Sequence, residues 1–103
     1  MNSIKHFFEK KYIYLVSHRY DDYSCISDFA NAFEDKKKAI LFLKEEMKNV
    51  INGIVKEREC SIDDIEIIEF TKDEEYSIEY DSIYCSFCID RIPLNQNILE
   101  QIN

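Results

Sequence analysis

The feature that most constrains the fold is a change in hydrophobic period near the middle of the chain. Between residues 40 and 54, apolar side chains recur at every third or fourth position, which places them along one side of an α-helix. These positions are Ile40, Leu43, Met47, Val50, Ile51 and Ile54. Asp35 is a suitable N-cap, so the pattern predicts a helix from 35 to 52. Asn52-Gly53 could end it, but Lys56 and Arg58 suit a last turn and favour an extension to 58.

Strand patterns lie on both sides of this helix. Tyr12 to Tyr20 is rich in β-branched and aromatic residues and is apolar on both faces at its centre, which predicts a central strand. A weaker strand is expected between Ser24 and Phe33. Three more are expected after the helix, at residues 65–70, 76–80 and 83–90, with a polar turn at 72–75 and a tight hairpin at Asp81-Ser82. A short helix or an anchored arm is expected at residues 3–10, and a short closing helix near residues 98–102.

This order predicts an α+β fold in which an antiparallel sheet of four to five strands carries one long amphipathic helix packed on one face. At 103 residues, with 46% hydrophobic residues, one Gly and one Pro, the chain has room for one core and contains no flexible linker. We therefore expect a single domain over residues 1–103.

The charge balance restricts the partners. The formal net charge is −8, which opposes direct binding to nucleic acid and to anionic lipid. The longest apolar run, Ala39 to Leu43, is too short to span a bilayer, and the first residues lack the pattern of a secretory signal. We expect a cytoplasmic protein, in the host cell cytoplasm if a phage encodes it, whose partner is a protein with a basic surface.

Cys85-Ser86-Phe87-Cys88 is the one recognisable spacing motif, and it could be half of a zinc site or a redox dithiol. Zinc needs four ligands, and the other candidates have no second paired spacing. These candidates are His6, His18, Cys25 and Cys60. Strand alternation also sends Cys85 and Cys88 to opposite faces. We expect no metal and no cofactor, with all four cysteines acting as small apolar residues in a reducing compartment.

Nothing in the sequence assembles a catalytic site. His18 could serve as a base, but no nucleophile is paired with it, and the adjacent carboxylates lie in turn-like stretches where solvated acids are expected. We expect no catalytic residues and predict that the chain is not an enzyme.

Acidic and aromatic residues together suggest a binding surface. Four acids share one parity around the strand at 76–80 and are expected to form a spaced row on its solvent face, while Tyr76, Ile78 and Tyr80 point inward. Tyr20-Asp21-Asp22-Tyr23 adds a second cluster, and tyrosine is enriched in interfaces. The predicted partner-binding residues are Tyr20, Asp21, Asp22, Asp73, Glu75, Glu79 and Asp81. Such a row can imitate a phosphate backbone; the alternative is that the acids only keep the domain soluble.

Three stretches, "YIYLVSHRYDD", "FEDKKKAILFL" and "YCSFCIDRIPLN", give the chain a layout that resembles small uncharacterised proteins carried by phages and mobile elements. The resemblance covers most of the chain and brings no catalytic or ligand residues. It implies encounters with host defence systems, and anti-CRISPR proteins are often small, acidic and without cofactors.

The function expected from this resemblance is an anti-CRISPR-like inhibitor that blocks a nucleic-acid-handling host defence protein, such as a CRISPR effector or a nuclease. One alternative is a toxin-immunity protein that plugs the active site of a toxin. The other is a regulatory module that self-associates through a sheet edge, so the chain is expected to be a monomer or a homodimer.

Overall fold

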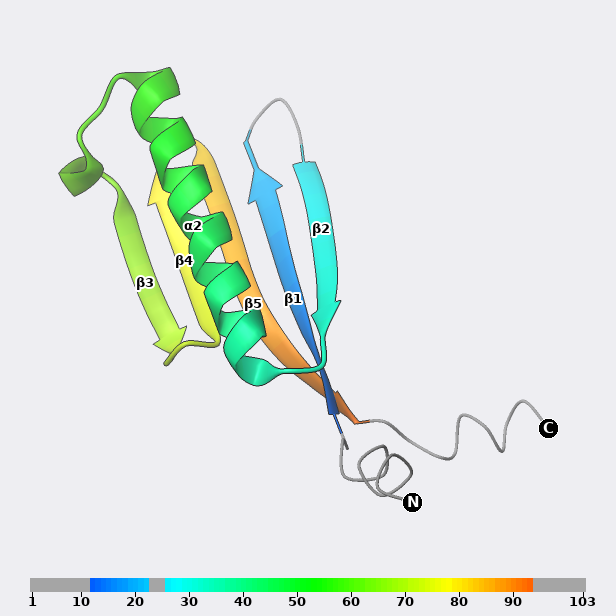
Figure 1. Cartoon of the computed structure of the whole chain (residues 1–103). Helices are drawn as coiled ribbons and strands as arrows, with labels where there is room; N and C mark the ends of the chain where they lie inside the picture. The colour runs from blue at the N-terminus through cyan, green and yellow to red at the C-terminus, as the bar shows by residue number, and fades with distance from the viewer. Residues whose placement is uncertain (1–11, 23–25, 94–103) are drawn as a thin grey trace, which may run out of the picture.

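The structure is a computed structural model that describes residues 12–22 and 26–93. Its elements in chain order are β1 (Tyr12–Asp21), β2 (Ile26–Phe33), α2 (Lys36–Arg58), the 3-10 turn η1 (Ile62–Asp64), β3 (Glu66–Thr71), β4 (Glu75–Tyr80) and β5 (Ile83–Pro93). The five strands form one sheet in the order β2-β1-β5-β4-β3, and every neighbouring pair is antiparallel. The helix α2 packs along one face of this sheet (Figure 1). The predicted α+β fold is confirmed.

The helix begins and ends as its local sequence directs. The Asp35 carboxylate accepts a hydrogen bond of 2.9 Å from the backbone N–H of Lys37, which satisfies one of the free donors of the first turn. The helix then runs through Gly53 and ends at Arg58, and it is followed by the C-cap residue Glu59, whose backbone is left-handed at φ 52°. Lys56 and Arg58 lie in the last turn, where cations complement the helix dipole. The longer of the two predicted extents is therefore the one observed.

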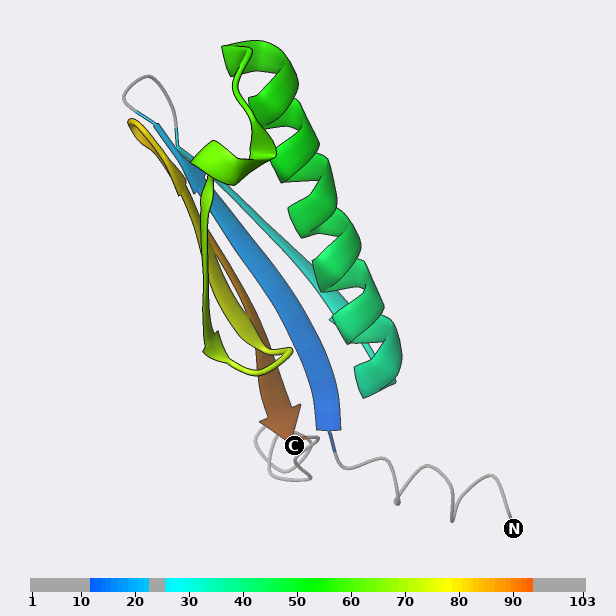
Figure 2. The ribbon, with the colours of Figure 1, turned by 90° about the vertical axis from the view of Figure 1, so that its left-hand side faces the viewer.

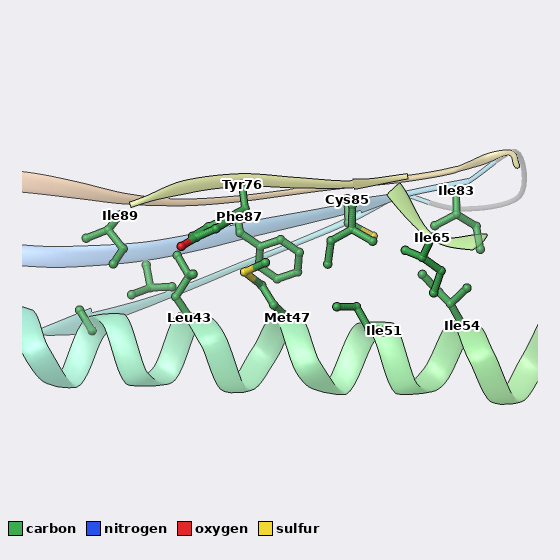
Figure 3. Packing of buried hydrophobic residues seen from close by; sticks show 13 residues of the cluster. Leu43, Met47, Ile51, Ile54, Ile65, Tyr76, Ile83, Cys85, Phe87 and Ile89 are labelled. Carbon is green, nitrogen blue, oxygen red and sulfur yellow. The ribbon is translucent and has the colours of Figure 1, made fainter. Parts of the chain in front are cut away.

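The core lies between the inner side of α2 and the facing side of the sheet (Figure 3). Leu43, Met47, Ile51 and Ile54 project from the helix toward the strands, and Leu43 is fully buried. The sheet contributes alternate residues of its central strands. These are Val16 from β1, Tyr76 and Ile78 from β4, and Ile83, Cys85, Phe87 and Ile89 from β5. The apolar periods of the helix and of the strands thus meet in one layer.

Two turns at opposite ends of β4 use aspartates in place of glycine. Asp73, between β3 and β4, has φ 61°, and Asp81, between β4 and β5, has φ 52°. Aspartate is among the few residues other than glycine that adopt this left-handed region without a large penalty. Tyr80 pairs with Ile83 across the two-residue loop Asp81-Ser82, so the predicted tight hairpin is present although it lacks glycine.

The second strand and the last strand differ from their predicted bounds. The strand expected from Ser24 begins at Ile26 in the structure, and the last strand continues past Asp90 to Pro93, where it pairs with Tyr12. The short helix or anchored arm expected at residues 3–10 and the short helix expected near residues 98–102 lie outside the described residues. With α2 on one side, the opposite face of the sheet carries no other element of the described chain (Figure 2).

Candidate functional site

The sheet face opposite α2, here called the open face, is strongly acidic. Among residues 12–22 and 26–93, strand alternation and the observed register place six carboxylates on it against one guanidinium, that of Arg19. The acids are Asp21, Asp28, Glu66, Glu75, Glu79 and Asp90. The imbalance gives this face a negative potential, which favours a basic partner surface.

One transverse line of neighbours on this face contains three of these acids around a tyrosine. Asp21 of β1 pairs with Tyr84 of β5, Tyr84 pairs with Glu79 of β4, and Glu79 pairs with Glu66 of β3. We call these four residues the acidic row. Tyr84 lies inside the row, between Asp21 and Glu79, and is 43% exposed. Because neighbouring strands lie about 4.8 Å apart, the row spans about 14 Å across the sheet, perpendicular to the strands.

Glu66 and Glu79 lie directly opposite each other in this row. Like charges at directly opposed positions of an antiparallel pair are destabilising. Among the described residues, no Lys, Arg or His side chain forms an ion pair with either carboxylate. The row therefore concentrates charge at a cost to the stability of the free chain.

The structure brings only some of the predicted binding residues together. Asp21 and Glu79, predicted from separate stretches, lie in the same acidic row. Glu75 is on the open face, opposite Cys88 of β5. Its carboxylate accepts a hydrogen bond of 3.4 Å from the Thr71 hydroxyl. It lies toward the other end of β4 from Glu79.

The expected row of four acids along β4 is not formed. The Asp73 carboxylate lies 2.8 Å from the Lys44 ammonium of α2, and the Asp81 carboxylate lies 3.8 Å from the Arg58 guanidinium at the end of the same helix. The hydrogen bond from Lys44 holds the pKa of Asp73 below its usual value. Both aspartates have positive φ, so strand alternation does not extend to them. They bind helix cations instead of extending the open face.

The cluster at Tyr20-Asp21-Asp22 is divided as well. Tyr20 is half-buried on the helix-facing side, opposite Cys85, whereas Asp21 faces the open side. Asp22 is half-buried just beyond the end of β1. Of the three residues, only Asp21 belongs to the acidic row.

Two members of the acidic row, Glu66 and Tyr84, were not predicted as binding residues. Each alternates with buried neighbours, Ile65 before Glu66 and Cys85 after Tyr84, which is a sequence signal for an outward side chain. Their position beside Glu79 follows from strand register, which no single segment specifies.

Ser77 lies on the open face between Glu75 and Glu79. Its side chain is 1% exposed, and its direct cross-strand neighbours are Ser86 and Ile68. In the described part of the chain its hydroxyl has no hydrogen-bond partner. An unpaired buried hydroxyl is unfavourable, so Ser77 weakens the packing at this point of the sheet.

A depression of about 300 Å³ adjoins the acidic row where small side chains of β1, β2 and β5 meet. Its lining includes Ser17, Ala30, Ser86 and Cys88. The Cys88 sulfur lies 3.1 Å from the Ser17 hydroxyl and 3.7 Å from a carboxylate oxygen of Asp90. Burial raises the pKa of the Cys88 thiol, although the Ser17 hydrogen bond opposes this, and a raised pKa disfavours the reactive thiolate.

His18 and Cys88 do not form a nucleophile–base pair. The His18 ring faces α2, where it packs 5.0 Å from the ring of Phe87 and its Nδ1 lies 4.0 Å from a carboxylate oxygen of Glu46. Cys88 lies on the open face, and Cys85 is buried on the helix-facing side, as strand alternation predicted. The described residues contain no group of three or more His, Cys, Asp or Glu side chains arranged to hold a metal ion.

Within residues 12–22 and 26–93, no helix is both long enough and apolar enough to cross a lipid bilayer. Comparison of the chain with family models, with curated proteins and with solved structures finds no match.

Proposed function

We propose that this chain is a protein-binding inhibitor, encoded by a mobile element, that occupies the basic nucleic-acid site of a host defence protein. The acidic row is the centre of the proposed contact, with Tyr84 as its aromatic anchor. CRISPR effectors and nucleases are the proposed class of target because both hold nucleic acid in channels lined with Lys and Arg.

The observation that carries this proposal is the direct pairing of Glu66 with Glu79 beside Asp21 and Tyr84. This arrangement is unfavourable in the free chain and becomes favourable when cations of a partner approach it. An exposed tyrosine at the centre of the row adds a large and rigid contact area at low conformational cost.

The experiment is an affinity capture from the lysate of the native host, analysed by mass spectrometry, with two matched double variants. Glu66→Gln/Glu79→Gln removes two charges from the acidic row. Glu45→Gln/Glu57→Gln removes two charges of the same kind from exposed positions on α2. We expect the captured protein to be lost with the first variant and retained with the second.

The captured protein is then purified and tested directly for nucleic-acid binding. Addition of the chain should displace nucleic acid from it, and the affinity between the two proteins should fall steeply between about 0.1 M and about 0.5 M salt, because exposed charges are screened over shorter distances at higher salt. Capture of a toxin that does not handle nucleic acid would favour the immunity alternative. An affinity independent of salt would contradict charge mimicry.

A further inference from the structure

The two edges of the sheet differ in how well they are protected against pairing with another strand. The edge strand β3 carries two carboxylates, Glu66 and Glu69, within six residues, and its register shifts between Glu69 and Thr71. Charges and bulges of this kind are the devices by which natural sheets prevent edge-to-edge association. The β3 edge is therefore protected.

The opposite edge strand, β2, is less protected. Its eight residues pair with β1 in one unbroken register, and it contains no Pro, Gly or Lys. Its one charged residue is Asp28, whose carboxylate lies 3.8 Å from the Arg19 guanidinium on β1. On a chain with a net charge of −8, this strand is a locally neutral strip, and no other described strand pairs with the backbone donors and acceptors on its outer side.

Phe29 lies at the middle of this edge and is 57% exposed. Its ring packs 5.1 Å from that of His18 on the helix-facing side of the sheet, beyond the cover that α2 provides. The neighbouring open-face residues Ala30 and Ala32 are small. The edge thus combines one large exposed aromatic ring with side chains that do not obstruct an incoming strand.

We propose that β2 pairs in antiparallel fashion with β2 of a second copy of this chain. The two copies are related by a two-fold axis that is perpendicular to the sheet and lies midway between their two Phe29 residues. In a continuous antiparallel sheet, directly opposed residues point to the same face. Between two identical strands this is possible only when one residue lies opposite its own copy, so the register is defined by the residue at the centre. Centring on Asp28 would oppose two like charges. Centring on Phe29 places the two rings side by side, pairs Asp28 with Ala30, and pairs Ser27 with Asn31.

The local charge favours a second copy as the occupant. Two molecules that each carry −8 repel each other on average, and the neutral strip of β2 adds no charge of its own to that repulsion. The register centred on Phe29 is also self-complementary, as a two-fold interface requires. The dimer would be a ten-stranded sheet with both open faces on the same side, which doubles the acidic surface. The pairing itself is independent of the function proposed above.

The test is the mass of the full chain in solution, measured by sedimentation and light scattering over a range of concentrations. The wild-type chain should reach twice the mass of one chain. Phe29→Lys should give the mass of a single chain, because lysine on an edge strand blocks pairing. Phe70→Lys is the matched control, since Phe70 is 60% exposed on the protected edge strand β3, and it should leave the dimer unchanged.

Cross-linking tests the register and does not depend on the folding of the lysine variant. Oxidation of Phe29→Cys should join two copies through position 29, whereas Phe70→Cys should give no more cross-linked product than the wild-type chain. Peptide mapping identifies the joined positions and separates them from the native cysteines. A wild-type chain that stays monomeric at every concentration would overturn the proposal, as would dimers abolished by Phe70→Lys and retained by Phe29→Lys.

Discussion

The Lys44 ammonium of α2 lies 2.8 Å from the Asp73 carboxylate in the turn between β3 and β4, and this contact joins the helix to the end of that hairpin. A second ion pair, 2.9 Å between Lys36 and Glu74, acts at the same place. Together they hold the β3–β4 turn against the first half of α2. Asp73 is therefore a structural contact in the free chain.

Replacing Lys44 should raise the pKa of Asp73 toward its ordinary value of 3.8, because the hydrogen bond from Lys44 is the largest cause of the lowered pKa. A carboxylate whose pKa is lower in the folded state contributes stability above pH 3.8, and this contribution is lost as the pH falls through the folded-state pKa. The measurement is an NMR titration of the Asp73 carboxyl group in Lys44→Met. Lys48→Met, one turn further along the helix, is the control and should leave the titration unchanged. An unchanged titration in Lys44→Met would assign the lowered pKa to Lys72 and Lys36 instead.

Reversing one charge of the opposed pair in the acidic row should stabilise the free chain. Glu79→Lys places a cation opposite Glu66, and we expect a gain of about 0.2–1 kcal/mol in the free energy of unfolding. Glu66→Lys should do the same. The double variant Glu66→Lys/Glu79→Lys again opposes like charges, so the two gains should fail to add, as urea denaturation of all four proteins will show. Additive gains would mean that only the lower net charge matters.

The elements were predictable from the sequence because each depends on a local pattern. The stripe from Ile40 to Ile54 defines α2, and the alternation from Ile83 to Ile89 defines the buried face of β5. The acidic row was only partly predictable. Alternation identifies Glu79 as outward-facing, but the position of Glu66 opposite it depends on strand register, which arises from the packing of the sheet as a unit. Asp73 was misplaced because its positive φ takes it out of the strand pattern.

Substitution of the buried Leu43 should cost far more stability than substitution of its near neighbour Leu41. Leu43 is fully buried against the sheet, so Leu43→Ala should lower the free energy of unfolding by about 2–5 kcal/mol. Leu41 is 69% exposed on the outer side of α2, and Leu41→Ala should change stability by no more than about 0.5 kcal/mol. Thermal and urea unfolding of both variants provide the comparison. Equal losses would contradict the orientation of α2 on the sheet.

Gly53 lies inside α2, where glycine weakens a helix through its conformational freedom. A Cβ at this position would meet nothing within 4 Å, so Gly53→Ala can be accommodated without steric cost. We expect the free energy of unfolding to rise by about 0.5–1 kcal/mol, measured by urea denaturation. Destabilisation would mean that the helix is interrupted at Asn52-Gly53, the shorter of the two extents that the sequence allowed.

Cys85 and Cys88 should not form a disulfide with each other in the folded chain. They are three residues apart in β5, which separates their Cα atoms by about 10 Å, beyond the roughly 7 Å that a disulfide can bridge. Their side chains also lie on opposite faces of the sheet. Treatment of the folded protein with a thiol oxidant, followed by digestion and mass spectrometry, should reveal no peptide that has lost two hydrogens across this pair. Formation of that disulfide under native conditions would require β5 to unfold locally. It would also support the reading of Cys85-Ser86-Phe87-Cys88 as a redox dithiol.

The two thiols should also differ in their reactivity toward an alkylating reagent. Burial raises the pKa of Cys85 to about 11, so only about one molecule in a thousand carries the thiolate at pH 8, and the side chain is inaccessible as well. Cys88 is half-buried on the open face and should react before Cys85 in the folded protein. Denaturation in urea should remove the difference, because both thiols then return to ordinary pKa values. Equal rates in the folded state would contradict the assignment of Cys85 to the core, and with it the register that places Tyr84 on the open face.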